Sequence, residues 1–255
     1  MALGTSIITV GDEILGGFIA DTNSRHLAKR AFHAGYPVQR IAVVGDDPAL
    51  IAGEVRAAVA DDAISRIVVS GGLGPTPDDR TVEGVSLGLG RSVEEHPAAL
   101  AHITGVVARM HAAGWVPTAG ISDANRKMAS APAEAQVLEN RRGMAPPLLC
   151  DLGADKLLFV LPGVPREFTV IVDEVLMPTY FVGGAAPIVE ERRFTGIPEA
   201  EFAPTLRRLG QEFADVVFGS YPQSESRDLI IRARGSDPNR IAAALRRLEE
   251  LGPSR

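Results

Sequence analysis

The residues best suited to chemistry are concentrated in one segment, Gly71-Gly72-Leu73-Gly74-Pro75-Thr76-Pro77-Asp78-Asp79-Arg80-Thr81. Glycines allow backbone N–H groups to approach a ligand closely, and a helix predicted to begin at Thr81 adds the positive end of its dipole. These features predict a phosphate-binding loop at Gly71, Gly72 and Gly74. A tight structural turn is the alternative interpretation of the same glycines.

Two adjacent carboxylates, Asp78 and Asp79, stand beside this loop. Carboxylates repel a bare anion, so their presence is explained if a divalent cation such as Mg²⁺ or Co²⁺ bridges them to a bound phosphate. Asp46, which follows a strand predicted over 38–44, is a further candidate ligand. The alternative role of these residues is helix capping, for which the neighbouring Asp47 is better placed than Asp46. We expect no organic cofactor.

Two other loops follow predicted strands, Gly11-Asp12-Glu13 near the N-terminus and Pro162-Gly163-Val164-Pro165-Arg166-Glu167 in the second half of the chain. Open α/β sheets bind ligands at the carboxyl ends of their strands. We therefore expect these two loops to converge with the glycine-rich loop on one site.

A compact polar and basic triplet, Asn125-Arg126-Lys127, lies on the loop-rich stretch 114–143. Its side chains could pair with phosphates, although solvated loop charges are the commoner use of such residues. The five histidines lack the spacing of a metal-binding motif. The triplet is therefore the candidate source of cationic groups for the site.

Alternating strands and helices organise the first two-thirds of the chain. Strands are predicted over 6–10, 38–44, 66–70 and 156–161, and helices over 49–60, 81–89, 97–113 and 166–176, the last stopped by Pro178. Such alternation is typical of an α/β domain with a mostly parallel sheet covered on both faces. A Gly- and Ala-rich stretch then separates a domain over 1–180 from a small β-α-β-β-α domain over 187–255.

Composition restricts the class of protein. The chain has 255 residues, 45 % hydrophobic and 23 % charged, with a net charge of -6. The acidic balance argues against nucleic-acid binding, and no apolar run approaches the roughly 20 residues that span a bilayer. The single cysteine, Cys150, lies in apolar sequence and is expected to be a buried thiol. These features predict a cytoplasmic protein that partners neither nucleic acid nor membrane.

Five motifs in order resemble the CinA family. They are Gly11-Asp12-Glu13-Ile14-Leu15, Asp21-Thr22-Asn23, the segment 71–79, Asn125-Arg126-Lys127 and Leu161-Pro162-Gly163-Val164-Pro165-Arg166-Glu167. The same order occurs in the molybdopterin-binding-like domain of eukaryotic FAD synthases. The resemblance implies a three-layer α/β/α domain related to molybdopterin adenylyltransferases, followed by a small α+β domain of the KH-like type.

The resemblance also implies an activity, metal-dependent hydrolysis of a nucleotide diphosphate such as ADP-ribose to AMP and ribose 5-phosphate. Asp79, Asp46 and Lys127 would be catalytic, and Asp46, Asp78 and Asp79 would bind the metal. The residues expected to bind substrate are Gly11, Glu13, Asp21, Asn23, Gly71, Gly72, Gly74, Pro75, Thr76, Asp78, Thr81, Asn125, Gly163, Pro165 and Glu167.

Two other functions share the same phosphate site. One is adenylyl transfer to molybdopterin in cofactor biosynthesis, and the other is non-catalytic binding of a nucleotide or pterin. The small C-terminal domain contains no Gly-x-x-Gly clamp, so its KH-like character does not predict RNA binding. We expect that domain to serve in a homodimer.

Overall fold

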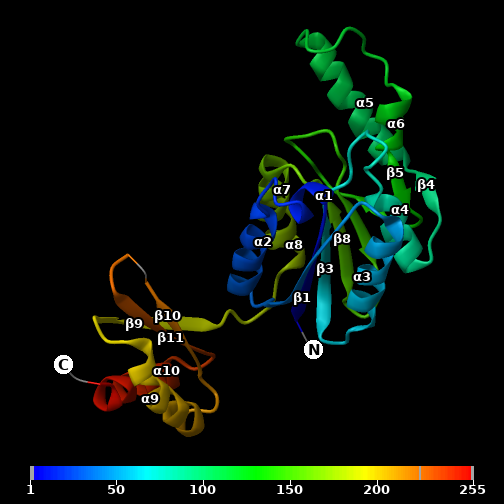
Figure 1. Cartoon of the computed structure of the whole chain (residues 1–255). Helices are drawn as coiled ribbons and strands as arrows, with labels where there is room; N and C mark the ends of the chain where they lie inside the picture. The colour runs from blue at the N-terminus through cyan, green and yellow to red at the C-terminus, as the bar shows by residue number, and fades with distance from the viewer. Residues whose placement is uncertain (1–2, 224, 254–255) are drawn as a thin grey trace. The chain divides into compact units, whose positions relative to one another are not determined.

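The computed structural model describes residues 3–223 and 225–253. Two compact units make up the chain, Met1–Gly184 and Ala185–Arg255. The first is an α/β unit built around one sheet, and the second is a smaller unit with its own sheet (Figure 1).

The sheet of the first unit has six strands in the order β2-β1-β3-β8-β7-β6. Four of them run parallel: β1 (Gly4–Val10), β2 (Val38–Val44), β3 (Ile64–Ser70) and β8 (Leu157–Leu161). β7 (Leu148–Asp151) and β6 (Gln136–Val137) pair antiparallel at one edge. The predicted mostly parallel sheet is confirmed. The antiparallel edge was not predicted, because these short strands depend on partners distant in sequence.

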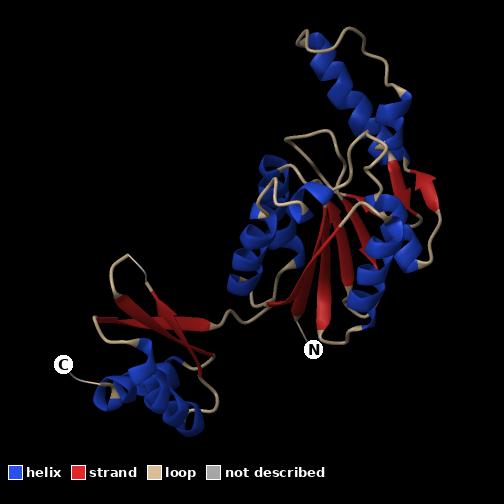
Figure 2. Ribbon diagram, viewed as in Figure 1, coloured by secondary structure: helices blue, strands red, loops and turns tan. Residues whose placement is uncertain are grey.

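Helices cover both faces of this sheet, which makes the unit three-layered (Figure 2). On one face, α3 (Pro48–Ala60) and α4 (Thr81–Leu89) pack on Ile8 and Val69. On the other face, α2 (Thr22–His33) and α7 (Pro165–Ile171) pack on Ile7 and Val68. These two residues precede Ile8 and Val69 in the same strands and point to the opposite face of the sheet. Each central strand therefore supplies both cores, as residues of alternating orientation in a strand must.

The final helix of the first unit continues past the predicted stop at Pro178, so that prediction is wrong. After α7, a π-helical segment, Val172–Leu176, leads into α8 (Met177–Tyr180). Pro178 lies in the first turn of α8. A helix tolerates proline in its first turn because the N–H that proline lacks would have no carbonyl partner within that helix.

A helical arm extends from the first unit beyond the sheet (Figure 1). It contains β4 (Val93–Glu95), α5 (Pro97–Ala112), α6 (Asp123–Lys127) and β5 (Ser130–Pro132). A small core of its own, formed by Ala99, Ile103, Val107 and Ala129, holds the arm together. In the described residues, no helix of the arm or elsewhere combines the length and the apolarity needed to cross a bilayer.

The second unit is a three-stranded antiparallel sheet with two helices, an α+β arrangement. Its strands are β9 (Ile188–Thr195), β10 (Val217–Pro222) and β11 (Asp228–Gly235), in the order β10-β11-β9. The helices α9 (Glu199–Glu212) and α10 (Pro238–Leu251) pack on one face of the sheet through a core that includes Phe202, Ile231 and Leu245.

Candidate functional site

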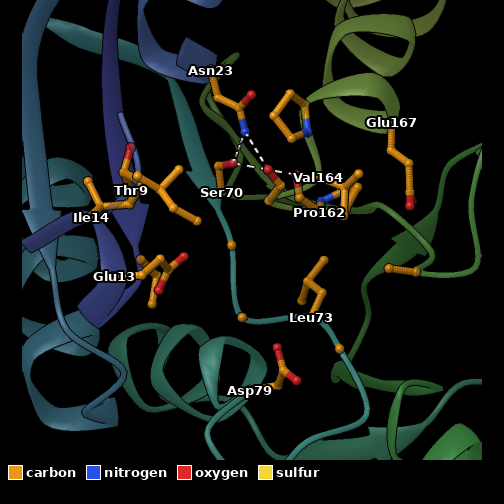
Figure 3. Close-up of a pocket in the computed structure, with 18 of the residues that line it drawn as sticks. Thr9, Glu13, Ile14, Asn23, Ser70, Leu73, Asp79, Pro162, Val164 and Glu167 are labelled. Atoms are coloured by element: carbon orange, nitrogen blue, oxygen red, sulfur yellow. Dashed lines mark hydrogen bonds between the residues drawn. The ribbon is translucent and has the colours of Figure 1, made fainter. Parts of the chain in front are cut away.

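A cavity of about 510 Å³ lies at the carboxyl ends of β1, β3 and β8 (Figure 3). The three loops expected to converge do so here. The predicted site residues that line it are Glu13, Asp21, Asn23, Gly71, Gly72, Gly74, Pro75, Asp79, Gly163, Pro165 and Glu167. The cavity is large enough for a ligand of nucleotide size.

Close backbone packing requires glycine at the centre of the site. Gly71 has a φ of 109°, and a Cβ there would lie 2.1 Å from the carbonyl oxygen of Val10. A Cβ on Gly163 would lie 3.2 Å from the Cα of Gly71. The amide of Asn23 donates to the Gly163 carbonyl at 2.9 Å. Asn23 therefore links the start of α2 to the loop that follows β8, in addition to lining the cavity.

Gly72 lies against the first residue of α4. Its φ is 60°, and a Cβ there would lie 2.3 Å from Oγ1 of Thr81, so glycine is required for a second reason. The N–H of Thr81 donates to the Gly72 carbonyl at 3.2 Å. Thr81 is fully buried, and in the described residues its hydroxyl has no hydrogen-bond partner. A donor without a partner thus stands directly behind the glycine-rich loop.

Asp79 closes the loop on itself rather than capping α4. Its Oδ2 accepts from the backbone N–H of Thr76 at 2.9 Å and from the Thr76 hydroxyl. The N-cap of α4 is Arg80, which makes no side-chain cap bond. Lys127 donates through Nζ to the Thr76 carbonyl. Lys127 and Asp79 also line a second cavity of about 80 Å³ behind the loop.

Asp46 and Asp78 lie outside the cavity wall, within an acidic neighbourhood. Oδ2 of Asp46 accepts from the N–H of Asp12 at 3.1 Å. Burial, followed by the charges of Asp12, Glu13 and Asp78, raises the pKa of Asp46 above its ordinary value. The nearby Thr76 hydroxyl, followed by the charge of Lys127, lowers the pKa of Asp78. Neighbouring negative charge of this kind favours a cation.

The predicted metal ligands do not form a preassembled cage. Among the residues the structure describes, no three His, Cys, Asp or Glu side chains are grouped so that they could hold a metal ion. Mg²⁺ is commonly held by one or two carboxylates together with substrate phosphates. Asp79, which lies on the wall beside the glycine-rich loop, fits that pattern, whereas a site built from Asp46, Asp78 and Asp79 together is not present as such.

The cavity has acidic and neutral walls. Glu13, Asp21, Asp79 and Glu167 line it, and its described lining includes no Lys, Arg or His. Asp21 is occupied structurally, since it caps α2 at Ser24 N and accepts from the Thr9 hydroxyl, both at 2.9 Å. Glu13, Asp79 and Glu167 are therefore the carboxylates left to face a ligand.

Four other predicted binding residues do not line the cavity: Gly11, Thr76, Thr81 and Asn125. Gly11 is buried beneath it at the end of β1. Asn125 forms a capping box with Ser122 at the start of α6, and its amide lies 3.2 Å from the sulfur of Met144. Asn125 therefore supports a lining residue instead of contacting the cavity.

Several lining residues were missed from the sequence. Thr9 and Ser70 lie at the ends of β1 and β3, before the glycines that turn the chain, and that position could have identified them. In the apolar wall, Ile14, Leu73 and Val164 lie within the motifs quoted above, whereas the other members had no such signal. The apolar wall comprises Ile14, Ile19, Leu73, Met128, Met144, Ala145 and Val164.

Comparison with known proteins agrees with this architecture. A family model described as a probable molybdopterin binding domain matches residues 6–181, and a model for the middle domain of FAD synthase matches residues 187–255. A protein of Pyrococcus horikoshii is 33 % identical over 251 residues, covering 96 % of this chain and 94 % of that protein.

CinA proteins are also similar. A CinA-like protein of Myxococcus xanthus is 34 % identical over 95 % of this chain, which spans 57 % of that longer relative. The crystal structure of a CinA protein of unknown function from Thermoplasma acidophilum superposes with a TM-score of 0.59 at 36 % identity, covering 68 % of this chain and 95 % of that one. The chain belongs to the CinA family and carries its molybdopterin-binding-type domain.

Proposed function

We propose that the first unit binds a phosphorylated ring compound of the pterin or nucleotide type. Its phosphate would lie at Gly71–Gly74, and its ring against the apolar wall. The description of the matching family model supports a pterin-type ligand. The cavity combines the backbone of the glycine-rich loop, which suits a phosphate, with apolar side chains, which suit a flat ring. A ligand that carries both groups fits this combination.

The observation that carries this proposal is the pairing of Gly72 with Thr81. Gly71 and Gly72 both have positive φ, so the chain turns sharply after β3. The N–H of Gly71 donates to the Leu161 carbonyl at 3.1 Å, which leaves the N–H groups of Gly72 and Gly74 for an anion. The N-terminus of α4 and the unpartnered Thr81 hydroxyl stand directly behind them. Because no Lys, Arg or His is among the described lining residues, neutral donors would hold the phosphate, with a cation at Asp79 balancing the remaining charge.

Hydrolysis of a nucleotide diphosphate is the second candidate, and the hydrogen bonds at Asp79 favour it. Thr76 orients the Asp79 carboxylate, and Lys127 holds Thr76 from behind. A divalent cation bound at Asp79 would supply Lewis-acid polarisation of the phosphate. ADP-ribose and one water would then give AMP and ribose 5-phosphate, the water oxygen forming a new bond to phosphorus as the bridging oxygen leaves. Adenylyl transfer to molybdopterin would use the same phosphate site.

Isothermal titration calorimetry with GMP, AMP, ADP and ADP-ribose tests the binding proposal, which requires that at least one of them binds. We expect Thr81→Val to weaken binding about 10- to 100-fold, the effect of losing a hydrogen bond to a charged group. Ser86→Ala is the matched control, since Ser86 is a second buried hydroxyl of α4 without a partner in the described residues. Absence of binding by the wild-type protein, or equal losses in both variants, would contradict the proposal.

Chromatographic analysis of the products separates binding from catalysis. The protein is incubated with ADP-ribose and Mg²⁺, Co²⁺ or EDTA, with Asp79→Asn as the variant. Metal-dependent AMP that disappears in Asp79→Asn supports hydrolysis. Tight binding without turnover leaves the binding function in place and rejects hydrolysis of this substrate.

A further inference from the structure

A buried amide holds one carboxylate of the cavity wall. Asn140 is only 3 % exposed, and its Nδ2 donates to Oε2 of Glu167 at 2.7 Å and to the Ala145 carbonyl at 2.9 Å. Its Oδ1 accepts from the N–H groups of Arg142 and Gly143, both at 3.0 Å. All the ordinary hydrogen-bonding capacity of this amide is therefore used.

The loop around Asn140 is shaped to admit Glu167. A Cβ added to Gly143 would lie 1.8 Å from the carboxylate carbon of Glu167, so the side chain occupies space that only glycine leaves free. His102 donates through Nε2 to the Gly143 carbonyl at 3.2 Å and holds the loop from the other side. The Glu167 carboxylate is thus placed by the Asn140 amide and by the space that Gly143 leaves.

This placement leaves Glu167 with unused acceptor capacity at the cavity. In the part of the chain that the structure describes, Oε1 accepts from no protein donor, and Oε2 retains a lone pair beyond its bond to Asn140. In Figure 3 the Glu167 side chain descends from α7 at the cavity wall, opposite Glu13. No described lining residue is cationic, so a ligand in the cavity would meet this carboxylate with its own N–H donors in place of water.

The chemistry of such an acceptor restricts the ring. A carboxylate accepts two parallel N–H bonds best, and guanine and pterin rings both present an N–H beside an amino group on the 2-amino-4-oxopyrimidine edge. Adenine presents an amino group beside a ring acceptor, which a carboxylate repels. Met144 and Ala145 belong to the same wall and offer apolar contact to a flat ring.

Resting on the function proposed above, we propose that Glu167 recognises the 2-amino-4-oxopyrimidine edge shared by guanine and pterin rings. Asn140 is its positioning residue. Glu167 thereby determines which ring enters the cavity, independently of the glycine-rich loop that holds the phosphate.

The test compares GMP, IMP and AMP by calorimetry, because they share a ribose 5′-phosphate and differ on the ring edge. We expect the wild-type protein to bind GMP about 10- to 100-fold more tightly than AMP, with IMP between them. Glu167→Gln should abolish this preference by weakening GMP while AMP changes less than about threefold. Glu201→Gln, at an exposed position on α9, is the control and should retain the preference.

Asn140→Ala provides the second variant. A purely structural role would weaken GMP and AMP equally, whereas a positioning role lowers the ratio of GMP to AMP affinity. Displacement of GMP by 6-hydroxymethylpterin in the wild type, but not in Glu167→Gln, would assign the ring to the pterin class. A GMP preference without such displacement would assign it to guanine.

Failures of the two proposals are distinguishable. If all three nucleotides bind the wild type equally, or Glu167→Gln weakens them equally, the recognition role of Glu167 is overturned and the phosphate site stands. If neither the nucleotides nor the pterin bind, both proposals are overturned.

Discussion

The hydroxyl of Thr81 lies against the backbone of Gly72, so closely that a Cβ on Gly72 would be 2.3 Å from Oγ1. The contact joins the first residue of α4 to the loop that ends β3. Because Thr81 is fully buried and its hydroxyl has no partner in the described residues, this contact positions a donor without using it. Both the stability of the loop and the binding of phosphate should depend on it.

Gly72→Ala should destabilise the protein more than Gly90→Ala. Both glycines have left-handed backbone, with φ of 60° and 67°, but only Gly72 has Thr81 in the space a Cβ would fill. The conformation alone costs about 1–2 kcal/mol, and the clash should add about 1–3 kcal/mol. Urea unfolding measures the difference. Equal losses in the two variants would mean that Thr81 moves aside freely.

Gly74→Ala should impair cation-dependent binding while leaving the fold intact. A Cβ on Gly74 would lie 2.5 Å from Oδ2 of Asp79, displacing the carboxylate that Thr76 orients. We expect the gain in ADP affinity on adding Mg²⁺ to fall about tenfold, which corresponds to about 1.4 kcal/mol. Gly53→Ala, where a Cβ meets nothing, is the control. An unchanged Mg²⁺ effect would exclude Asp79 from the cation site.

Asp46→Asn and Asp78→Asn should change stability in opposite directions. Burial and neighbouring carboxylates raise the folded-state pKa of Asp46, so its ionised form destabilises the fold above that pKa. Asp46→Asn should therefore stabilise at pH 7, with a gain that shrinks as the pH falls toward 3.8 and below. Thr76 lowers the folded-state pKa of Asp78. Asp78→Asn should therefore destabilise at pH 7, with a loss that fades as the pH falls below 3.8.

Urea unfolding from pH 3 to pH 8 checks both signs. If Asp46 also takes part in cation binding, Asp46→Asn should weaken Mg²⁺ binding even as it stabilises the apo protein. A uniform effect across this pH range would contradict the electrostatic origin of either change.

Arg66→Ala should destabilise the first unit by about 2–4 kcal/mol, the effect of removing a buried guanidinium together with the hydrogen bonds and the ring contact that it makes. Arg66 is 4 % exposed and donates to the carbonyls of Tyr180 at 2.8 Å and Asp155 at 2.6 Å. Its guanidinium also lies 5.0 Å from the ring centroid of Tyr36. Arg56→Ala, an exposed change on α3, should have little effect on the unfolding midpoint. A similar midpoint for both variants would contradict this assignment.

Cys150 should resist thiol reagents in the native state. The thiol is fully buried in β7, and burial raises its pKa to about 11, so little thiolate is present at pH 8. We expect labelling by a disulfide reagent to be slow in buffer and fast in urea. Rapid labelling of the native protein would show that the β7 edge of the sheet opens readily.

The sequence by itself determined the elements and the loops that carry the chemistry. The β-branched segments that form β1 and β3, the cap at Asp47 and the glycines at 71, 72 and 74 act through local preferences, which a short stretch of chain already contains. The α/β class and the convergence of the three loops follow from these, because parallel strands end at one edge of a sheet.

Only the tertiary structure decided the roles within the site. Asn23 bonds a residue 140 positions away, and Asn140 bonds Glu167 across 27 positions, so neither contact can be inferred from its neighbours in sequence. Three other features also could not be inferred from neighbouring residues. They are the antiparallel edge at β7, the helix that continues through Pro178, and the absence of cationic side chains from the described cavity wall. Each depends on which distant segments pack together, because side-chain hydrogen bonds and shared charge act through space.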